Sequence, residues 1–365
     1  MRLIVLALFL SLATACSGAP PGAEETSRVA SAIIDGTASD ESQNAVVRLV
    51  IVNPANNESD TVCTGTLVAP DIVLTARHCV SRTEESVTCL EVDGKLVGGA
   101  IFEDHQPENV LVVVGVKPGA AQTDAIGAKI FHDSATNLCG HDVALVVLDR
   151  KLGSPIAPIR IDTSATTNDR FTAVGWGTNG TSLPTVRQQR AGVVVQYIGP
   201  AVIDLDTGHR VAIGSNELLA GESDCSGDSG GPALDATTGA IIGVATRSGV
   251  GAPDTTSPCR NSKNVYAVPS GFVDVIDAAF SAAGDKVWSE GNPEPPRPPT
   301  TPVATSKSGC TMHASGERAT LATWALVGLL VAGCRLRRAE KARARESHHV
   351  SRQVSARASA EPHDA

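Results

Sequence analysis

The sequence predicts an all-β body, built as a sandwich or a pair of barrels, with one helix at its C-terminal end. Apolar runs of strand length, rich in valine and isoleucine, are separated by Gly, Pro, Asn and Asp. Long helical periodicity first appears at residues 268–284, where Ser270 is placed to cap a helix and Gly284 to end it. Repeated strands without alternating helices favour this class. The predicted strands are 45–52, 65–76, 109–116, 142–149, 170–176, 191–199 and 239–246.

Composition limits the core and the partners. Hydrophobic residues make up 42% of the 365 residues but aromatic residues only 3%, so aliphatic side chains must fill the core. The net charge of −9 is uneven, because residues 335–365 hold eight basic and four acidic residues. The remaining body is acidic, and nucleic acid is therefore not expected as a partner.

The N-terminus reads as a secretory signal. Arg2 precedes an apolar stretch at 3–12, and the small residues at 13–15 form a cleavage site, so residues 1–15 are a predicted signal peptide. Cys16 stands where lipoprotein processing would leave a lipidated cysteine, although ordinary cleavage would use the same bond. Residues 16–32 are then a propeptide or linker.

The C-terminal end suggests an anchor. Residues 285–309 are a predicted Pro-rich linker, and residues 319–334 are apolar and followed by an arginine cluster. A cysteine, an apolar helix and basic residues in this order resemble the C-terminal sorting tails of myxobacterial surface proteins. The resemblance makes 310–345 a sorting or transmembrane segment, with Cys310 at its processing site and a polar tail at 346–365. A buried C-terminal helix is the alternative.

Nine cysteines are present, and six lie between residues 60 and 260, an even number suited to disulfides in an oxidising compartment. No C-x-x-C pair occurs, and the acidic stretches at 91–94 and 104–109 lack calcium-loop spacing. Neither a metal nor another cofactor is expected.

Three segments carry residues for nucleophilic catalysis. His78 lies in LTARHC, Asp142 opens an apolar strand in HDVALV, and Ser229 lies in CSGDSGGP. A serine nucleophile needs a base to take its proton, a carboxylate to orient that base, and backbone N–H groups for the oxyanion. The glycines around Ser229 allow backbone amides to converge there.

These three motifs together resemble the chymotrypsin/trypsin family of serine proteases over residues 33–284. The resemblance implies two six-stranded antiparallel barrels with the active site between them and a C-terminal helix. His78 would act as base and then acid, Asp142 would orient it, and Ser229 would form the acyl-enzyme. The N–H groups of Gly227 and Ser229 would form the oxyanion hole.

The resemblance also implies three disulfides and an activation step. The disulfides would be Cys63–Cys79, Cys225–Cys259 and, for the remaining two, Cys89–Cys139. In the family, cleavage frees an amine that pairs with the aspartate before the serine, here Ile33 with Asp228. No Lys or Arg stands directly before Ile33, and the nearest basic residue is Arg28, so another protease would have to cut after Ala32, or the chain works without the free amine.

The resemblance leaves the substrate pocket open. Ser223 occupies the family's deep pocket position, which favours apolar side chains, but Asp224 follows and would attract Lys or Arg if it faces the pocket. The alternatives are a small-to-medium side chain, or an Asp224 that faces solvent. Asn264 would shorten the pocket or polarise its floor.

Further departures from the family lie beside the predicted triad. Strand 243–251 should pair with the substrate backbone, with Thr246 in place of the serine that supports the triad aspartate. Arg247 replaces a tryptophan, and Ser248 replaces a glycine at the pocket entrance. Arg77 replaces a small residue before the histidine and is expected to point to solvent.

The sequence thus predicts a secreted or surface-anchored serine endopeptidase that acts on proteins or peptides. An activating protease, a sorting enzyme and the membrane, reached through one or both ends, are its other expected partners. The alternative function is a catalytically silent, protease-like binding module tethered at the cell surface.

Overall fold

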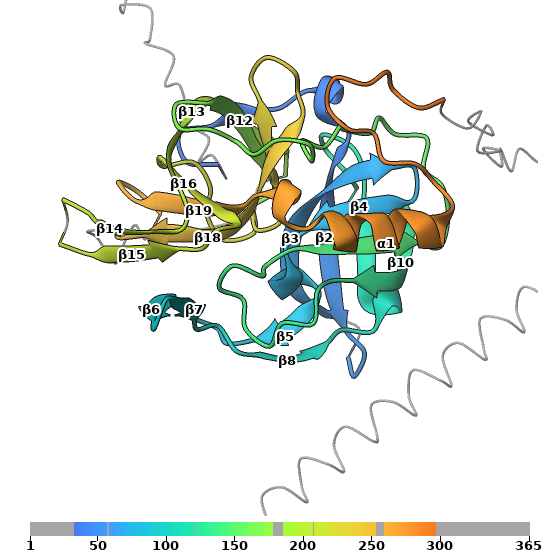
Figure 1. Ribbon diagram of the computed structural model, residues 1–365. Helices are drawn as coiled ribbons and strands as arrows, with labels where there is room; N and C mark the ends of the chain where they lie inside the picture. The colour runs from blue at the N-terminus through green and yellow to red at the C-terminus, as the bar shows by residue number, and fades with distance from the viewer. Residues whose placement is uncertain are drawn as a thin grey trace, which may run out of the picture. The chain divides into compact units, whose positions relative to one another are not determined.

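The computed structural model describes residues 33–56, 58–119, 121–177, 185–206, 208–252 and 259–296 (Figure 1). Contacts divide the chain into two units, Met1–Thr301 and Pro302–Ala365, and all described residues belong to the first. The predicted signal peptide, Cys16, Cys310 and the apolar segment 319–334 lie outside the described residues. Among the described residues no helix has the length and apolar character needed to cross a membrane.

The first barrel closes in the strand order β10-β11-β4-β3-β2-β9. Every neighbouring pair is antiparallel, and β9 returns to pair with β10. Its strands are β2 (Val46–Asn53), β3 (Glu58–Ala69), β4 (Ile72–Thr75), β9 (Val110–Val113), β10 (Ala125–Phe131) and β11 (Ala144–Leu148).

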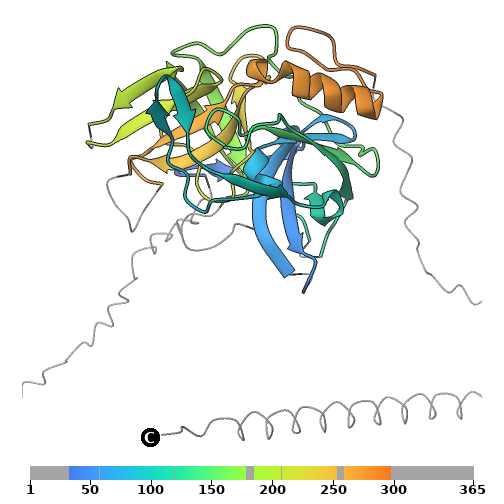
Figure 2. The ribbon, with the colours of Figure 1, turned by 60° about the horizontal axis from the view of Figure 1, so that its bottom comes forward.

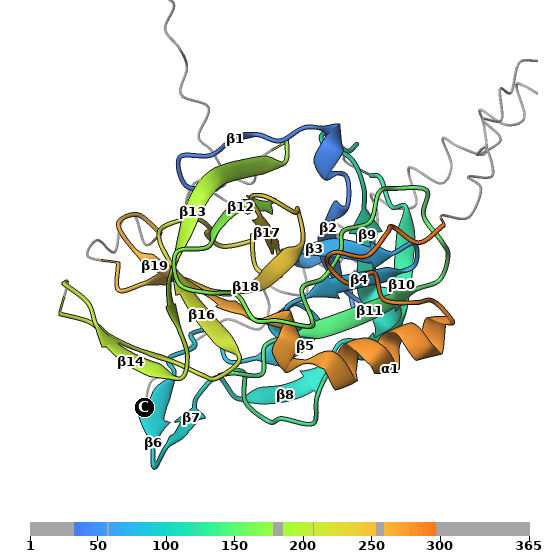
Figure 3. The same ribbon diagram turned by 45° about the horizontal axis from the view of Figure 1, so that its top comes forward.

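The second barrel has the order β13-β12-β17-β18-β19-β16 and closes because β16 pairs again with β13. The short β1 (Thr37–Ala38) adds to β13, as Figure 3 shows. The two six-stranded antiparallel barrels confirm the fold expected from the sequence. The strands are β12 (Arg170–Gly175), β13 (Gln188–Ile198), β16 (Glu217–Ala220), β17 (Pro232–Asp235), β18 (Ile241–Val250) and β19 (Lys263–Ala267).

Three two-stranded sheets extend from the barrels. They are β5 (Ser81–Thr83) with β8 (Ile101–Asp104), β6 (Leu90–Val92) with β7 (Lys95–Val97), and β14 (Ala201–Asp204) with β15 (Arg210–Ile213). Short 3-10 turns are η1 (Glu41–Gln43), η2 (Arg77–Cys79), η3 (Pro107–Asn109) and η4 (Pro269–Gly271).

Aliphatic side chains fill both barrels, as the composition predicted. In β2 the inward residues Val47, Leu49 and Ile51 alternate with outward ones and are fully buried. Among the described residues the one α-helix is α1 (Val273–Ala283), which packs Ile276, Ala279 and Phe280 onto the first barrel (Figure 2). Gly284 ends the helix in the left-handed conformation, as expected.

The predicted helix start was wrong. Ser270 lies in η4, and Phe272 occupies the N-cap position without a side-chain cap. Pro269 begins η4, so the chain makes a tight turn before α1 starts. Beyond Gly284, the first part of the expected linker still packs on the body, because the Ile159 N–H bonds to the Trp288 carbonyl.

The N-terminal part of the described chain is held by a buried arginine. Arg187 is 0% exposed, and its guanidinium donates to the Ser39 hydroxyl at 2.7 Å and to the carbonyls of Val46 at 2.7 Å and Asp40 at 2.6 Å. Burial lowers the pKa of Arg187 to about 10. Its hydrogen bonds join the entry to β13 to the segment that leads into β2.

Arg187→Met should lower the free energy of unfolding by about 3 kcal/mol, because it leaves buried carbonyls without donors. Urea titration measures the change. The matched control is Arg170→Met on the neighbouring strand β12, where the side chain is exposed; it should stay within about 0.5 kcal/mol. Equal effects in the two variants would contradict a structural role for the Arg187 hydrogen bonds.

Candidate active site

His78 and Asp142 meet at the edge of the first barrel. His78 lies in η2 directly after β4, and Asp142 precedes β11, which pairs with β4. The His78 Nδ1 atom lies 2.7 Å from Asp142 Oδ2, and the His78 backbone N–H donates to Asp142 Oδ1 at 2.9 Å. The carboxylate therefore contacts both the ring and the main chain of the histidine.

The environment of His78 favours its protonated form overall. Burial by itself lowers the pKa of His78, but the charge of Asp142 and its hydrogen bond raise it by more, so the pKa lies above the ordinary value. The side chain remains 22% exposed. A histidine with this environment can take a proton and stabilise the resulting charge.

Ser229 comes from the second barrel, in the loop between β16 and β17. Thr64 of β3 holds this loop: its N–H donates to the Ser229 carbonyl at 2.8 Å, and its hydroxyl donates to the Gly227 carbonyl at 2.9 Å. Ser229, His78 and Asp142 all line one cleft of about 580 Å³. The structure thus brings the three predicted catalytic residues to the same cavity.

The loop before Ser229 leaves two backbone donors available. The Asp228 N–H bonds to the Cys225 carbonyl and the Gly231 N–H to the Asp228 carbonyl. Among the described residues, the N–H groups of Gly227 and Ser229 have no acceptor. Gly227 has a φ of +95°, which side-chain-bearing residues rarely adopt. This turn has the composition and the free donors that an oxyanion hole needs.

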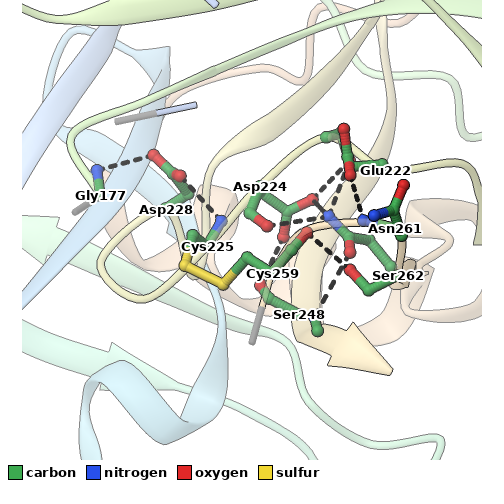
Figure 4. Close-up of a disulfide and its surroundings, with 12 residues drawn as sticks. Gly177, Glu222, Asp224, Cys225, Asp228, Ser248, Cys259, Asn261 and Ser262 are labelled. Atoms are coloured by element: carbon green, nitrogen blue, oxygen red, sulfur yellow. Dashed lines mark hydrogen bonds between the residues drawn. A yellow bond between two sulfur atoms is a disulfide. The ribbon is translucent and has the colours of Figure 1, made fainter. Parts of the chain in front are cut away.

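Asp224 points into the protein, so the alternative of a solvent-facing side chain is excluded. It is 1% exposed, and Figure 4 shows it among polar side chains. Its Oδ1 accepts hydrogen bonds from the hydroxyls of Ser223 and Tyr266, each at 2.6 Å, and from the Asn264 amide. Its Oδ2 accepts from the Ser248 hydroxyl at 2.7 Å.

Four of the five predicted pocket residues therefore belong to one network, and Thr246 does not. The Thr246 hydroxyl donates to the Val265 carbonyl at 2.9 Å, so the expected support of Asp142 is wrong. Thr246 lies on β18, which pairs with β19, so the carbonyl of Val265 on β19 is within hydrogen-bonding distance.

The sequence did not predict that Tyr266 belongs to this network. It follows Asn264 by two on β19, and residues so spaced share a strand face.

Asp228 is buried beside this network. Its Oδ1 accepts from the Gly177 N–H at 2.6 Å and its Oδ2 from the Cys225 N–H at 3.0 Å (Figure 4). Burial, together with the charge of Asp224, raises the pKa of Asp228 to about 8. Ile33 is 0% exposed and packs in the second barrel, and among the described residues Asp228 forms no ion pair.

Arg77 is also buried, so the expectation that it points to solvent was wrong. Its side chain is 6% exposed, and it donates to the carbonyls of Asp133 and Ala135. Arg247 contacts Glu217 at 2.7 Å, and both line the cleft. Local sequence could not show that Arg77 pairs with Asp133 or Arg247 with Glu217, since each partner lies tens of residues away along the chain.

The three expected disulfides, Cys63–Cys79, Cys89–Cys139 and Cys225–Cys259, are present. Ligand atoms of Cys63, His78 and Cys79 lie within 4.8 Å of one another. The two sulfurs are bonded to each other, however, and so offer no thiolate to a metal.

The family model described as Trypsin matches residues 34–275. The chain belongs to the trypsin family. A curated relative, Hypodermin-B of Hypoderma lineatum, is 30% identical over 190 residues, which cover 50% of this chain and 66% of the relative. Venom serine protease of Polistes dominula is 26% identical over 203 residues, covering 52% of this chain and 64% of the relative. The matches thus span slightly less than two thirds of either relative.

Two solved structures are similar to this trypsin-family chain at low identity. One, titled "Structure of GrC", has a TM-score of 0.47 at 18% identity and covers 67% of this chain and 98% of its own. The other, titled "HL collagenase structure at 1.7A resolution", has a TM-score of 0.46 at 17% identity, with 69% and 99% covered.

The raised pKa of Asp228 predicts how stability depends on pH in a chain not cut before Ile33. Asp228 stays protonated in the folded state up to about pH 8, whereas it ionises near pH 4 when unfolded. The free energy of unfolding should therefore fall as pH rises from about 4 to about 8, by up to about 1.4 kcal/mol per pH unit. Asp228→Asn should remove this slope, as urea titrations across the range would show. A difference between the two proteins that does not vary with pH would contradict the prediction.

Proposed function

We propose that this chain is a secreted serine endopeptidase that cleaves after lysine or arginine through an acyl-enzyme. The contact between His78 and Asp142, in the cleft that also holds Ser229, is the observation that carries the proposal. Family membership supports the same chemistry.

The reaction follows from the roles of these groups. His78 takes the proton of the Ser229 hydroxyl as its oxygen attacks the substrate carbonyl, and Asp142 stabilises the imidazolium. The N–H groups of Gly227 and Ser229 bind the oxyanion. When the C–N bond breaks, His78 gives its proton to the leaving amine. Water then attacks the acyl-enzyme with His78 again as base, and the acid product leaves as Ser229 regains its proton.

The buried carboxylate of Asp224 supports a basic side chain before the cut bond. Among the described residues it has no cationic partner, and a buried charge without one is costly. Ser248 both lines the cleft and donates to Asp224 Oδ2, so a single hydroxyl connects the cleft with this carboxylate. The ammonium or guanidinium group of a substrate would supply the missing positive charge.

Activation and location are parts of the same proposal. A cut after Ala32 would free the Ile33 amine to pair with Asp228, and another protease would make it. The signal peptide would direct the chain out of the cytoplasm. Lipidation at Cys16 or processing at Cys310 by a sorting enzyme would hold it at the surface.

The nucleophile is tested with a fluorophosphonate probe on the processed protein. Ser229→Ala should abolish labelling and reduce peptide hydrolysis by at least about 10³-fold. Ser226→Ala is the matched control, because Ser226 lines the same cleft three residues earlier, and it should keep both activities. If the unsubstituted protein does not label, the chain is the silent binding module instead.

The choice of substrate is tested with peptides that carry arginine or citrulline before the cut bond. The two side chains have nearly the same shape, but only arginine is charged. We expect kcat/KM to favour arginine by about 10²-fold, and Asp224→Asn to remove most of this preference while Ser229 still labels. Equal rates for the two peptides, or a preference for small side chains, would show that Asp224 does not receive the substrate.

A further inference from the structure

Arg77 and His141 stand immediately before the two residues of the His78–Asp142 pair, and both bind Asp133. Arg77 precedes His78 in η2, and His141 precedes Asp142. Asp133 lies after β10, outside the Ser229 motif and outside the cleft lining. Asp133 therefore connects the segment that holds His78, the predicted base, with the segment that holds Asp142, and it does so from outside the cleft.

The arginine arm of this connection is buried. Arg77 Nη1 lies 2.7 Å from the Ala135 carbonyl, 3.2 Å from the Asp133 carbonyl and 3.3 Å from Asp133 Oδ1. The Ala135 N–H donates to the same Oδ1 at 3.1 Å, which closes a turn around the guanidinium. A small residue at position 77 could make none of these contacts, so Arg77 fixes η2 to the segment after β10.

The histidine arm is short and partly exposed. His141 Nδ1 lies 2.6 Å from Asp133 Oδ2, and the His141 side chain is 42% exposed. The charged groups that act on His141 are Asp133, Glu217 and Arg77. The hydrogen bond to Asp133 raises the pKa of His141. One carboxylate oxygen of Asp133, Oδ1, thus contacts Arg77, and the other, Oδ2, contacts His141.

Asp133 is itself held from its other side. The His132 Nδ1 atom lies 2.6 Å from the Asp133 carbonyl, and His132 Nε2 lies 2.8 Å from Asp104 Oδ2. The Ser81 hydroxyl donates to Asp104 Oδ1 at 2.6 Å. These contacts hold the main chain of Asp133, and both arms attach to its carboxylate.

We propose that Asp133 is a positioning residue that clamps Arg77 to His141 and thereby holds His78 against Asp142. The inference rests on the proposed function, because it concerns the same proton transfer. Proton transfer depends steeply on the placement of the base, and a displacement of about 1 Å can cost about 10²-fold in rate. Asp133 acts through its neighbours and does not touch the substrate.

Asp133→Asn tests the clamp, because it keeps the shape of the side chain and removes its charge. The measurement is the rate of fluorophosphonate labelling of the full processed protein as a function of pH. The fall of this rate at low pH reports the protonation of His78. We expect the plateau rate to fall about tenfold and the midpoint to move to lower pH. The direction follows because the Asp142 contact raises the pKa of His78, and a looser contact raises it less.

Glu103→Gln is the matched control for charge alone. Glu103 also pairs with a cation, Arg82, but it contacts neither Arg77 nor His141 and takes no part in the hydrogen bonds that hold Asp133. It should leave the plateau and the midpoint close to those of the unsubstituted protein. An equal shift in the two variants would overturn the clamp in favour of a general charge effect.

His141→Gln keeps the test decisive if Asp133→Asn does not fold. It should lower kcat about tenfold on the alkaline plateau, with KM unchanged, because it breaks one arm without touching the substrate. The double variant should be no slower than Asp133→Asn, since both remove the same link. A loss that is uniform across pH, with fewer active sites labelled, would show a purely structural role. Failure of the unsubstituted protein to label would instead contradict the proposed function.

Discussion

The alignment of the site depends on the hydrogen bonds of one threonine. Ser229 belongs to the second barrel, whereas His78 and Asp142 belong to the first, so their relative placement is set where the barrels meet. Thr64 binds the carbonyls of Ser229 and Gly227, and its hydroxyl also accepts from the Trp176 N–H at 3.1 Å. Gly230 allows this approach, because a Cβ there would lie 2.3 Å from the Thr64 carbonyl. The loop that carries Ser229 is thus attached through its backbone, and none of these hydrogen bonds uses the Ser229 side chain.

The second barrel buries two neighbouring carboxyl groups, those of Asp224 and Asp228. Asp224 and Asp228 lie close enough for the charge of one to raise the pKa of the other, and the described residues offer neither a cation. In a core selected for stability alone such a pair would be replaced by apolar residues. In the proposed enzyme the two carboxyl groups would pair with different cations: Asp228 with the amine freed by processing, and Asp224 with the basic side chain of the substrate. The buried charge of Arg77 in the first barrel differs from these two groups, because its guanidinium already donates to the carbonyls of Asp133 and Ala135.

Much of the fold could be predicted, because strand periodicity and the three motifs are local signals. The apolar runs mark strands in both barrels, since burial on a sheet repeats every two residues. The run 65–76, predicted as one strand, is two strands, β3 and β4, and the barrel strands β10, β16, β17 and β19 were not predicted. The hairpin of β6 and β7 was not predicted, although Asp93-Gly94 is a typical turn sequence and both residues have positive φ. The errors at Thr246 and Arg77 share one cause, because each side chain took a partner distant in sequence: Val265 for Thr246 and Asp133 for Arg77. The error at Ser270 is local, since Pro269 begins a 3-10 turn there.

The sequence by itself determined the residue types of the site, the disulfide set that the family resemblance implies, and the strands that carry them, since these follow from motifs a few residues long. Only the tertiary structure decided the direction of Asp224, because Ser248, Asn264 and Tyr266 reach it from strands that are apart in sequence. It also decided that Arg77 is buried and that Asp133 joins it to His141. Hydrogen bonds of this kind depend on where the closed barrels place each strand end, and no local pattern in the chain records that placement.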